Sequence, residues 1–190
     1  ASQKAYELVE QEKRTYVHSF KDEAVFAANG ALLLEILQQQ PDLDTIIVPI
    51  GGGGLISGIS FVAKHLPSKI RVYGMQTNAF PSMYKSFHRG ELVKVTGKPT
   101  IADGVAVKQT TSEAFSYVSQ FVDDIFTVTD TQIKKAMHLL MHHVSVIPEP
   151  AGAVALAGLI AHRKEIKGKK IGVIVSGGNI DKELLVKIIS

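Results

Sequence analysis

Hydrophobic and polar positions follow two different spacings along this chain, and the change from one to the other is sharpest at residues 45–66. β-branched residues dominate the run from Ile46 to Ile50, which predicts a buried strand. Four glycines, Gly51 to Gly54, come next and predict a tight loop. From Leu55 onward, apolar residues recur at helical spacing. Backbone N–H groups are therefore exposed between the end of a strand and the start of a helix, where a phosphate binds favourably.

The same two spacings predict the remaining elements. Strands are expected at residues 15–18, 46–50, 70–75, 125–128 and 171–175. Helices are expected at residues 1–14, 22–40, 55–66, 81–87, 111–121, 129–141 and 150–163, and near the carboxyl end. Strands that alternate with helices predict an α/β fold, in which a parallel sheet is covered by helices on both faces.

Three local signals refine this picture. Thr129 and Gln132 have the spacing of a capping box, and Pro150 suits the first turn of a helix. Gly30 lies inside a predicted helix, where glycine costs about 1 kcal/mol against alanine. We therefore expect another segment to approach the chain closely at Gly30.

The glycine loop does not match the common nucleotide motifs. A Walker loop needs Gly-Lys-Ser/Thr at its end, and Leu55-Ile56-Ser57 stands there instead. A dinucleotide fingerprint needs a third glycine and an acidic residue after the next strand, and Gln76 occupies that second place. A ligand that has one phosphate and no ribose fits better.

Further glycine-containing turns are expected at the same edge of the sheet. The turn at 176–179 would bring Ser176 and Asn179 to this edge, because ligands bind outside the carboxyl ends of parallel strands. The segments around Gly104 and Glu149 could supply further walls. Each turn alone is typical of ordinary loops, and only their combination favours a binding site.

Composition narrows the class of protein. The chain has 190 residues, 45% of them hydrophobic, which is enough for one substantial core. A net charge of +3 and only a short basic run argue against nucleic acid, and no apolar run reaches the roughly 20 residues that span a bilayer. The lack of cysteine is compatible with a cytoplasmic enzyme. Since the first residue is not methionine, we expect a piece of a longer protein.

Five motifs in order resemble one known family over essentially the whole chain: VPIGGGGLISGI, TIADGVAVK, VDDIFTVT, PEPAGAVAL and VSGGNID. They are similar to the carboxyl-terminal part of the catalytic region of serine/threonine dehydratases. These are pyridoxal-phosphate enzymes of the tryptophan-synthase-β structural class, also called fold type II. The stretches GMQTN and SFHRGEL are most similar to the catabolic threonine dehydratases. The resemblance implies an incomplete large cofactor-binding domain of that fold type.

The resemblance also implies roles for particular residues. Gly51, Gly52, Gly53, Gly54 and Leu55 would cradle the cofactor phosphate, and the Ser176 hydroxyl would bond the pyridine nitrogen. Gly104, Glu149 and Asn179 would lie near the ring. The implied reaction is α,β-elimination, which converts L-threonine to 2-oxobutyrate and ammonia, and L-serine to pyruvate. A neutral hydroxyl makes the ring a milder electron sink, which suffices for this chemistry.

The departures from the family pattern matter as much. The family's Schiff-base lysine lies near the amino end of the full enzyme, so we expect no catalytic residue within this chain. Ser19-Phe20-Lys21 copies the first residues of the lysine motif, but the surrounding order makes Lys21 an accidental match. Residues 1–18 would end the smaller domain and return to the large domain at 19–190. We expect the fragment alone to be inactive.

Metal ions are not expected. The racemase branch of the family binds a divalent cation on acidic residues, and Gln76 and Ser82 stand at the similar places here. His138 and His142 are four residues apart but have no evident acidic third ligand.

Other interpretations stay open. One is a dinucleotide-binding oxidoreductase domain, and another is a non-catalytic half-enzyme that binds the cofactor or an effector. The resemblance implies a homodimer or homotetramer and a small amino-acid substrate, and it leaves a nucleotide effector open.

Overall fold

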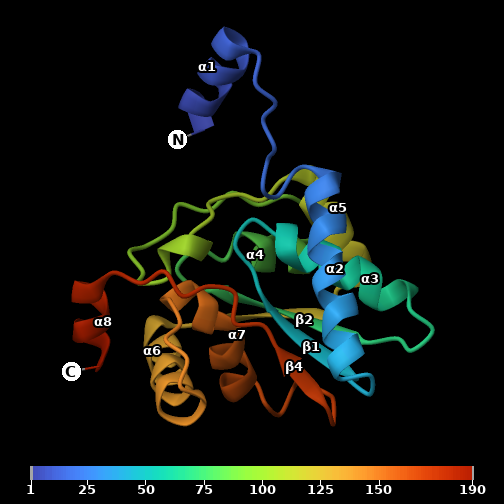
Figure 1. Ribbon diagram of the computed structural model, residues 1–190, viewed down its shortest axis with the longest axis vertical. Helices are drawn as coiled ribbons and strands as arrows, with labels where there is room; N and C mark the ends of the chain where they lie inside the picture. Colours follow the sequence, from blue (N-terminus) through green and yellow to red (C-terminus); the bar gives the residue numbers. More distant parts are fainter. Residues whose placement is uncertain (1, 190) are drawn as a thin grey trace.

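A parallel sheet of four strands forms the centre of the protein. The computed structural model describes residues 2–189 (Figure 1). The strands lie in the order β3-β2-β1-β4, and all neighbouring pairs are parallel. The register pairs Ile47 of β1 with Tyr73 and with Val173. The bounds are β1 Thr45–Pro49, β2 Arg71–Thr77, β3 Asp124–Val128 and β4 Ile171–Val173.

Helices cover both faces of this sheet. Along β1, Ile46 and Val48 pack in one core with α2, α3 and α5, whereas Ile47 packs in the other core with α6 and α7. Figure 1 shows these two helical layers on opposite sides of the strands. The predicted α/β class, with a sheet covered on both faces, is confirmed. The helices are α1 Ser2–Glu12, α2 Glu23–Gln39, α3 Gly54–His65, α4 Ser82–Arg89, α5 Ser112–Phe121, α6 Asp130–Leu139, α7 Pro150–Ala161 and α8 Lys182–Ile189, with a 3₁₀ turn η1 at Asp103–Val105 and a π turn η2 at Leu140–Val144.

Two of the local signals act as predicted. Thr129 and Gln132 form both hydrogen bonds of the capping box at the start of α6. Pro150 occupies the first turn of α7, where its missing N–H costs nothing. Asp22 stands at the cap position of α2, but its side chain makes no capping hydrogen bond.

The expected strand at 15–18 is wrong. Residues 13–17 run without strand pairing, and the side chains instead form a series of edge-on ring contacts. The ring centroids lie 5.2 Å apart between Tyr6 and Tyr16, 5.7 Å between Tyr16 and His18, and 4.6 Å between His18 and Phe20. Of the residues that suggested a strand, Tyr16 and His18 serve these contacts, whereas Val17 is exposed. β4 is also shorter than predicted and ends at Val173.

Helices α2 and α3 approach each other through glycine. A Cβ on Gly30 would lie 2.7 Å from Val62 Cγ2, and one on Gly58 would collide with the carbonyl oxygen of Phe26. The close approach expected at Gly30 is confirmed. Because α3 begins at the glycine loop, this tight packing holds that loop against the body of the protein.

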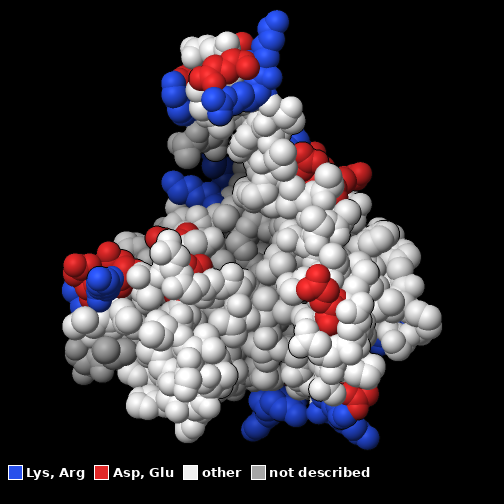
Figure 2. All heavy atoms as spheres, viewed as in Figure 1, with Lys and Arg blue, Asp and Glu red and all other residues white. Residues whose placement is uncertain are grey.

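Charged side chains gather at the margins of the face shown in Figure 2, mainly on α1, on α8 and at the lower edge. The broad surface between them is mostly uncharged. Among the described residues, no helix combines the length and the apolar character that a bilayer crossing requires.

Candidate functional site

The ends of β1 and of the segment after β4 open onto one cavity of about 260 Å³. Its position outside the carboxyl ends of the strands is where parallel sheets bind ligands. The structure therefore brings together Ser176, Gly104 and the predicted loop residues Gly51 to Leu55. The complete lining is Ser19, Phe20, Pro49, Gly51, Gly52, Gly53, Gly54, Leu55, Gly104, Val105, Val107 and Ser176.

The glycine loop offers free backbone donors to this cavity. Gly53 has a left-handed conformation, with φ of 105°, and is the residue before α3. Within residues 2–189, none of the N–H groups from Gly52 to Leu55 donates to a protein acceptor. Gly52, Gly53 and Gly54 are buried, and buried N–H groups are nearly always paired. These amides, at the positive end of the α3 dipole, fit the phosphate of pyridoxal phosphate.

Two residues of the cavity wall were not predicted from the sequence. Ser19 and Phe20 lie over the glycine loop, and the Phe20 ring occupies the space that a side chain at Gly52 would need. Thr111 holds this segment, since its Oγ1 donates to the carbonyl oxygen of Phe20 at 2.7 Å. Neither Ser19 nor Phe20 belongs to a periodic pattern. The contact between Phe20 and Gly52 joins residues 32 positions apart, so no local sequence signal could indicate it.

The remaining predicted residues, around the turn after β4, lie in two different cavities. Ser176 lines the first cavity, whereas Glu149 and Asn179 line a neighbouring cavity of about 310 Å³. The two cavities adjoin at Gly104, where a Cβ would lie 3.6 Å from Glu149 Oε1. The backbone N–H of Glu149 donates to the carbonyl oxygen of Gly177 at 3.0 Å, which ties this turn to the start of α7.

Lys21 lies elsewhere. Its side chain is exposed and lines a different hollow, together with Tyr6, Tyr16, His18, Asp22 and Glu23. The two preceding residues, Ser19 and Phe20, reach the glycine loop, but the lysine is not among the residues that line that cavity.

The residues considered for metal binding have structural partners. Gln76 and Ser82 are fully buried, and the Ser82 hydroxyl donates to the carbonyl oxygen of Val107 at 2.7 Å. His138 Nε2 lies 2.8 Å from the carbonyl oxygen of Ile188 and its ring stacks on His142. Across the described residues, no three or more His, Cys, Asp or Glu side chains are placed to hold a metal ion.

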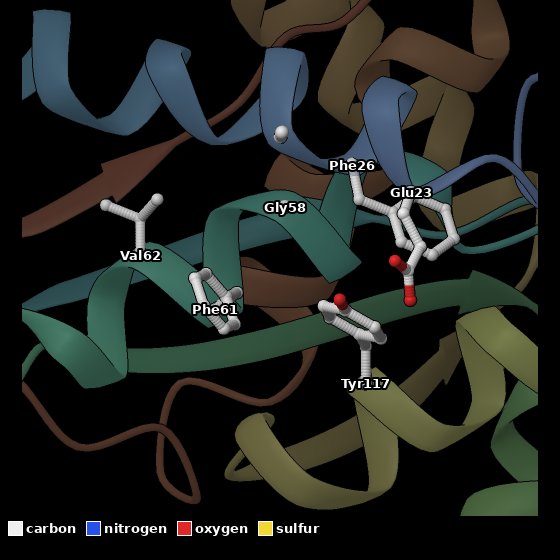
Figure 3. A pocket seen from close by; sticks show the side chains of 7 residues that line it. Glu23, Phe26, Gly58, Phe61, Val62 and Tyr117 are labelled. Carbon is white, nitrogen blue, oxygen red and sulfur yellow. The ribbon is translucent and has the colours of Figure 1, made fainter.

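A smaller cavity of about 80 Å³ lies between α2, α3 and α5, away from the strand ends. Figure 3 shows the rings of Phe26, Phe61 and Tyr117 around it, with the Glu23 carboxylate directed toward Tyr117. Its lining is otherwise apolar, so it offers no group of donors comparable to the glycine loop. We regard it as a packing gap beside the close contact at Gly58.

Comparison with known proteins identifies the family of this chain. The family model described as "Pyridoxal-phosphate dependent enzyme" matches residues 1–177. The chain is 40% identical to L-threonine ammonia-lyase of Thermotoga maritima over 190 residues, which are 100% of this chain and 47% of that protein. It is 39% identical to the catabolic L-threonine dehydratase TdcB of Escherichia coli K12, over 94% of this chain and 55% of that protein.

Solved structures agree on the fold. The structure of maize serine racemase superposes with a TM-score of 0.91 at 32% identity, over 99% of this chain and 58% of the racemase chain. The chain thus spans about half the length of the curated relatives it matches. The family match also favours pyridoxal phosphate over a dinucleotide as the cofactor. This chain belongs to the family of pyridoxal-phosphate dependent enzymes.

Proposed function

We propose that residues 1–190 are the cofactor-binding part of an ammonia-lyase that converts L-threonine to 2-oxobutyrate and ammonia. L-Serine would be converted to pyruvate in the same way. The observation that carries this proposal is the cavity in which buried, unpaired loop amides share one space with Ser176. The 40% identity to an L-threonine ammonia-lyase supports the choice of substrate.

The residues of this chain would bind and orient the cofactor. The amides of Gly52 to Leu55 would hold its phosphate, and the Ser176 hydroxyl would bond the ring nitrogen. Pyridoxal phosphate, when bound, supplies an electron sink for the charge that α-proton removal leaves on the substrate. Phe20 would shield the phosphate loop from water. Gly104 would lie beside the ring, with Glu149 and Asn179 at the adjoining cavity.

We further propose how this chain divides. Residues 1–18 would end a smaller domain, and residues 19–190 would form the large domain. In support, α1 stands apart from the sheet and its helices, joined by residues 13–19 (Figure 1). The lysine that removes the α-proton would lie outside residues 1–190, so this part alone would be inactive. We expect the full protein to be a homodimer or homotetramer.

Peptide mapping after borohydride reduction tests the proposal. The protein is purified from its source and reduced, and the pyridoxyl group is located by mass spectrometry. We expect the group on a lysine outside residues 1–190. A group on Lys21 would overturn the assignment of the base. A protein that binds pyridoxal phosphate but yields no adduct would favour the non-catalytic half-enzyme.

A further inference from the structure

The carbonyl groups of the glycine loop have buried partners. The Thr110 hydroxyl donates to the carbonyl oxygen of Gly52 at 2.6 Å, and the Gln76 side-chain amide donates to that of Gly51 at 3.4 Å. Thr110 is 4% exposed and Gln76 is fully buried. Neither side chain is among the residues that line the cavity, so both contact the loop on the side that faces away from the cavity. One comes from the end of β2 and the other from the segment before α5.

Each of these bonds fixes a whole peptide plane. In a trans peptide, the C=O of one residue and the N–H of the next lie in one plane and point in opposite directions. The described chain contains no cis peptide bond. A partner for the Gly52 carbonyl therefore sets the direction of the Gly53 N–H, and a partner for the Gly51 carbonyl sets that of the Gly52 N–H. Both carbonyls are held on the side away from the cavity.

The orientation of the Gln76 amide is itself determined. Its Oε1 accepts the backbone N–H of Tyr84 at 2.9 Å. Since that oxygen is used as an acceptor, Nε2 is the end that faces Gly51. A carboxylate at position 76 could accept from Tyr84 but could not donate to Gly51, so the neutral amide is required for both contacts.

We propose that Thr110 and Gln76 are positioning residues, which aim the N–H groups of Gly53 and Gly52 at a bound phosphate. This inference rests on the proposed function, since it names what prepares the same loop for its ligand. Peptide planes that are oriented before binding need not be ordered when the phosphate arrives, and this raises affinity. Neither residue lines the cavity, so neither would touch the ligand itself.

The test compares Thr110→Val with Thr110→Ser in the full-length protein after removal of its cofactor. Valine keeps the volume and removes the donor, whereas serine keeps the hydroxyl. Dissociation constants are measured by calorimetry for pyridoxal phosphate, inorganic phosphate and pyridoxal. We expect Thr110→Val to weaken the binding of pyridoxal phosphate and of inorganic phosphate about tenfold, which corresponds to about 1.4 kcal/mol of binding free energy. Pyridoxal binding should stay unchanged, and Thr110→Ser should restore the affinity to within about threefold.

Thr45→Val is the matched control. Thr45 is also fully buried and its hydroxyl also lies within hydrogen-bond distance of a carbonyl oxygen, that of Lys167 at 2.9 Å, sharing its proton with Asp44 Oδ1, but it lies at the opposite end of β1. This variant should bind phosphate ligands like the wild type. Equal phosphate affinity in the Val and Ser variants would overturn the inference. An equally large loss of affinity for pyridoxal in Thr110→Val would also overturn it, because that would indicate general damage to the fold.

Gln76→Glu gives an independent readout. The buried carboxylate should weaken pyridoxal phosphate binding at pH 8, and affinity relative to the wild type should recover at lower pH, where the protonated carboxyl can donate again. A pH-independent ratio would contradict the role of Gln76. If the wild type binds inorganic phosphate but shows no preference for pyridoxal phosphate, the proposed function fails, while the Thr110 comparison with inorganic phosphate still decides this inference. If it binds neither, both fail.

Discussion

At the scale of single residues, Gly53 has the most constrained position in the candidate site. Its φ of 105° is strained for any residue with a side chain. A Cβ there would also lie 2.7 Å from Met83 Cε and 3.1 Å from Ala114 Cβ. Helices α4 and α5 thus pack against the loop on the side that faces the core. Only glycine can adopt this backbone conformation and also fit the space between the two helices.

Gly53→Ala should therefore weaken pyridoxal phosphate binding about tenfold or more. The left-handed conformation alone costs about 1–2 kcal/mol, and relief of the strain would turn the loop amides away. The measurement is a cofactor titration. Gly90→Ala is the control, because Gly90 has φ of 73° but a Cβ there meets nothing within 4 Å. That variant should lose stability and keep cofactor affinity. Equal affinity in both variants would contradict the role of the loop.

Ser176→Asp should lower turnover of L-threonine at least tenfold in the full-length enzyme. A carboxylate would hold a proton on the ring nitrogen and change the electron sink that the neutral hydroxyl sets. Steady-state kinetics give the measurement, and Ser176→Thr, which keeps the hydroxyl, is the control. Unchanged turnover in the Asp variant would remove Ser176 from its proposed role.

At the scale of elements, the α2–α3 pair supports the loop by close packing. The two glycines in this contact are not equivalent. The nearest atom to a Cβ on Gly30 is the end of the Val62 side chain, whereas a Cβ on Gly58 meets the backbone of Phe26. A side chain can change its rotamer, but the backbone of a packed helix moves only if the helices separate.

Gly58→Ala should lower the free energy of unfolding by about 1–3 kcal/mol, the range of overpacked cores, although alanine favours the helix by about 1 kcal/mol. Gly30→Ala should lower it less, because Val62 can move. Urea denaturation of the two variants gives the comparison. A larger loss for Gly30→Ala would show that the separation of the helices is not set by the backbone contact at Phe26.

At the scale of the whole molecule, Asp44 joins the ends of β1 and β4. Its carboxylate accepts the backbone N–H of Lys169 at 2.8 Å and of Lys170 at 3.2 Å, and the Thr45 hydroxyl at 2.8 Å. The bond from the Lys169 N–H, followed by that from Thr45, lowers the pKa of Asp44, and Arg71 contributes a weaker attraction. β4 has only three residues, so this anchor helps to fix its amino-terminal end beside β1.

Asp44→Asn should reduce the free energy of unfolding at pH 7 by about 1 kcal/mol, since a neutral amide accepts these bonds less well. Because the pKa is lower in the folded state, the contribution of Asp44 is complete above the ordinary carboxyl pKa near 4. It is lost as the pH falls through the folded pKa. The difference between wild type and variant should therefore shrink below about pH 4. A difference that stays constant from pH 7 to pH 2.5 would contradict this assignment.

Local patterns were enough for much of the fold and for part of the site. The change of spacing at residues 45–66 placed the glycine loop between a strand and a helix, and the structure has it there. The Thr129 capping box and Pro150 correctly predicted two helix starts. These signals work because helix and strand periodicity, turn chemistry and capping depend on residues only a few positions apart.

Contacts between distant segments lay beyond such patterns. Residues 15–18 have strand-like composition, but a strand exists only where another strand supplies hydrogen-bond partners, and here the rings pack on one another instead. Phe20 reaches Gly52, Thr110 reaches the Gly52 carbonyl, and Glu149 and Asn179 lie in an adjoining cavity. Sequence periodicity identified the glycine loop as the segment whose amides face the cavity. The direction of those amides depends on partners that the folded chain brings from 25 and 58 positions away.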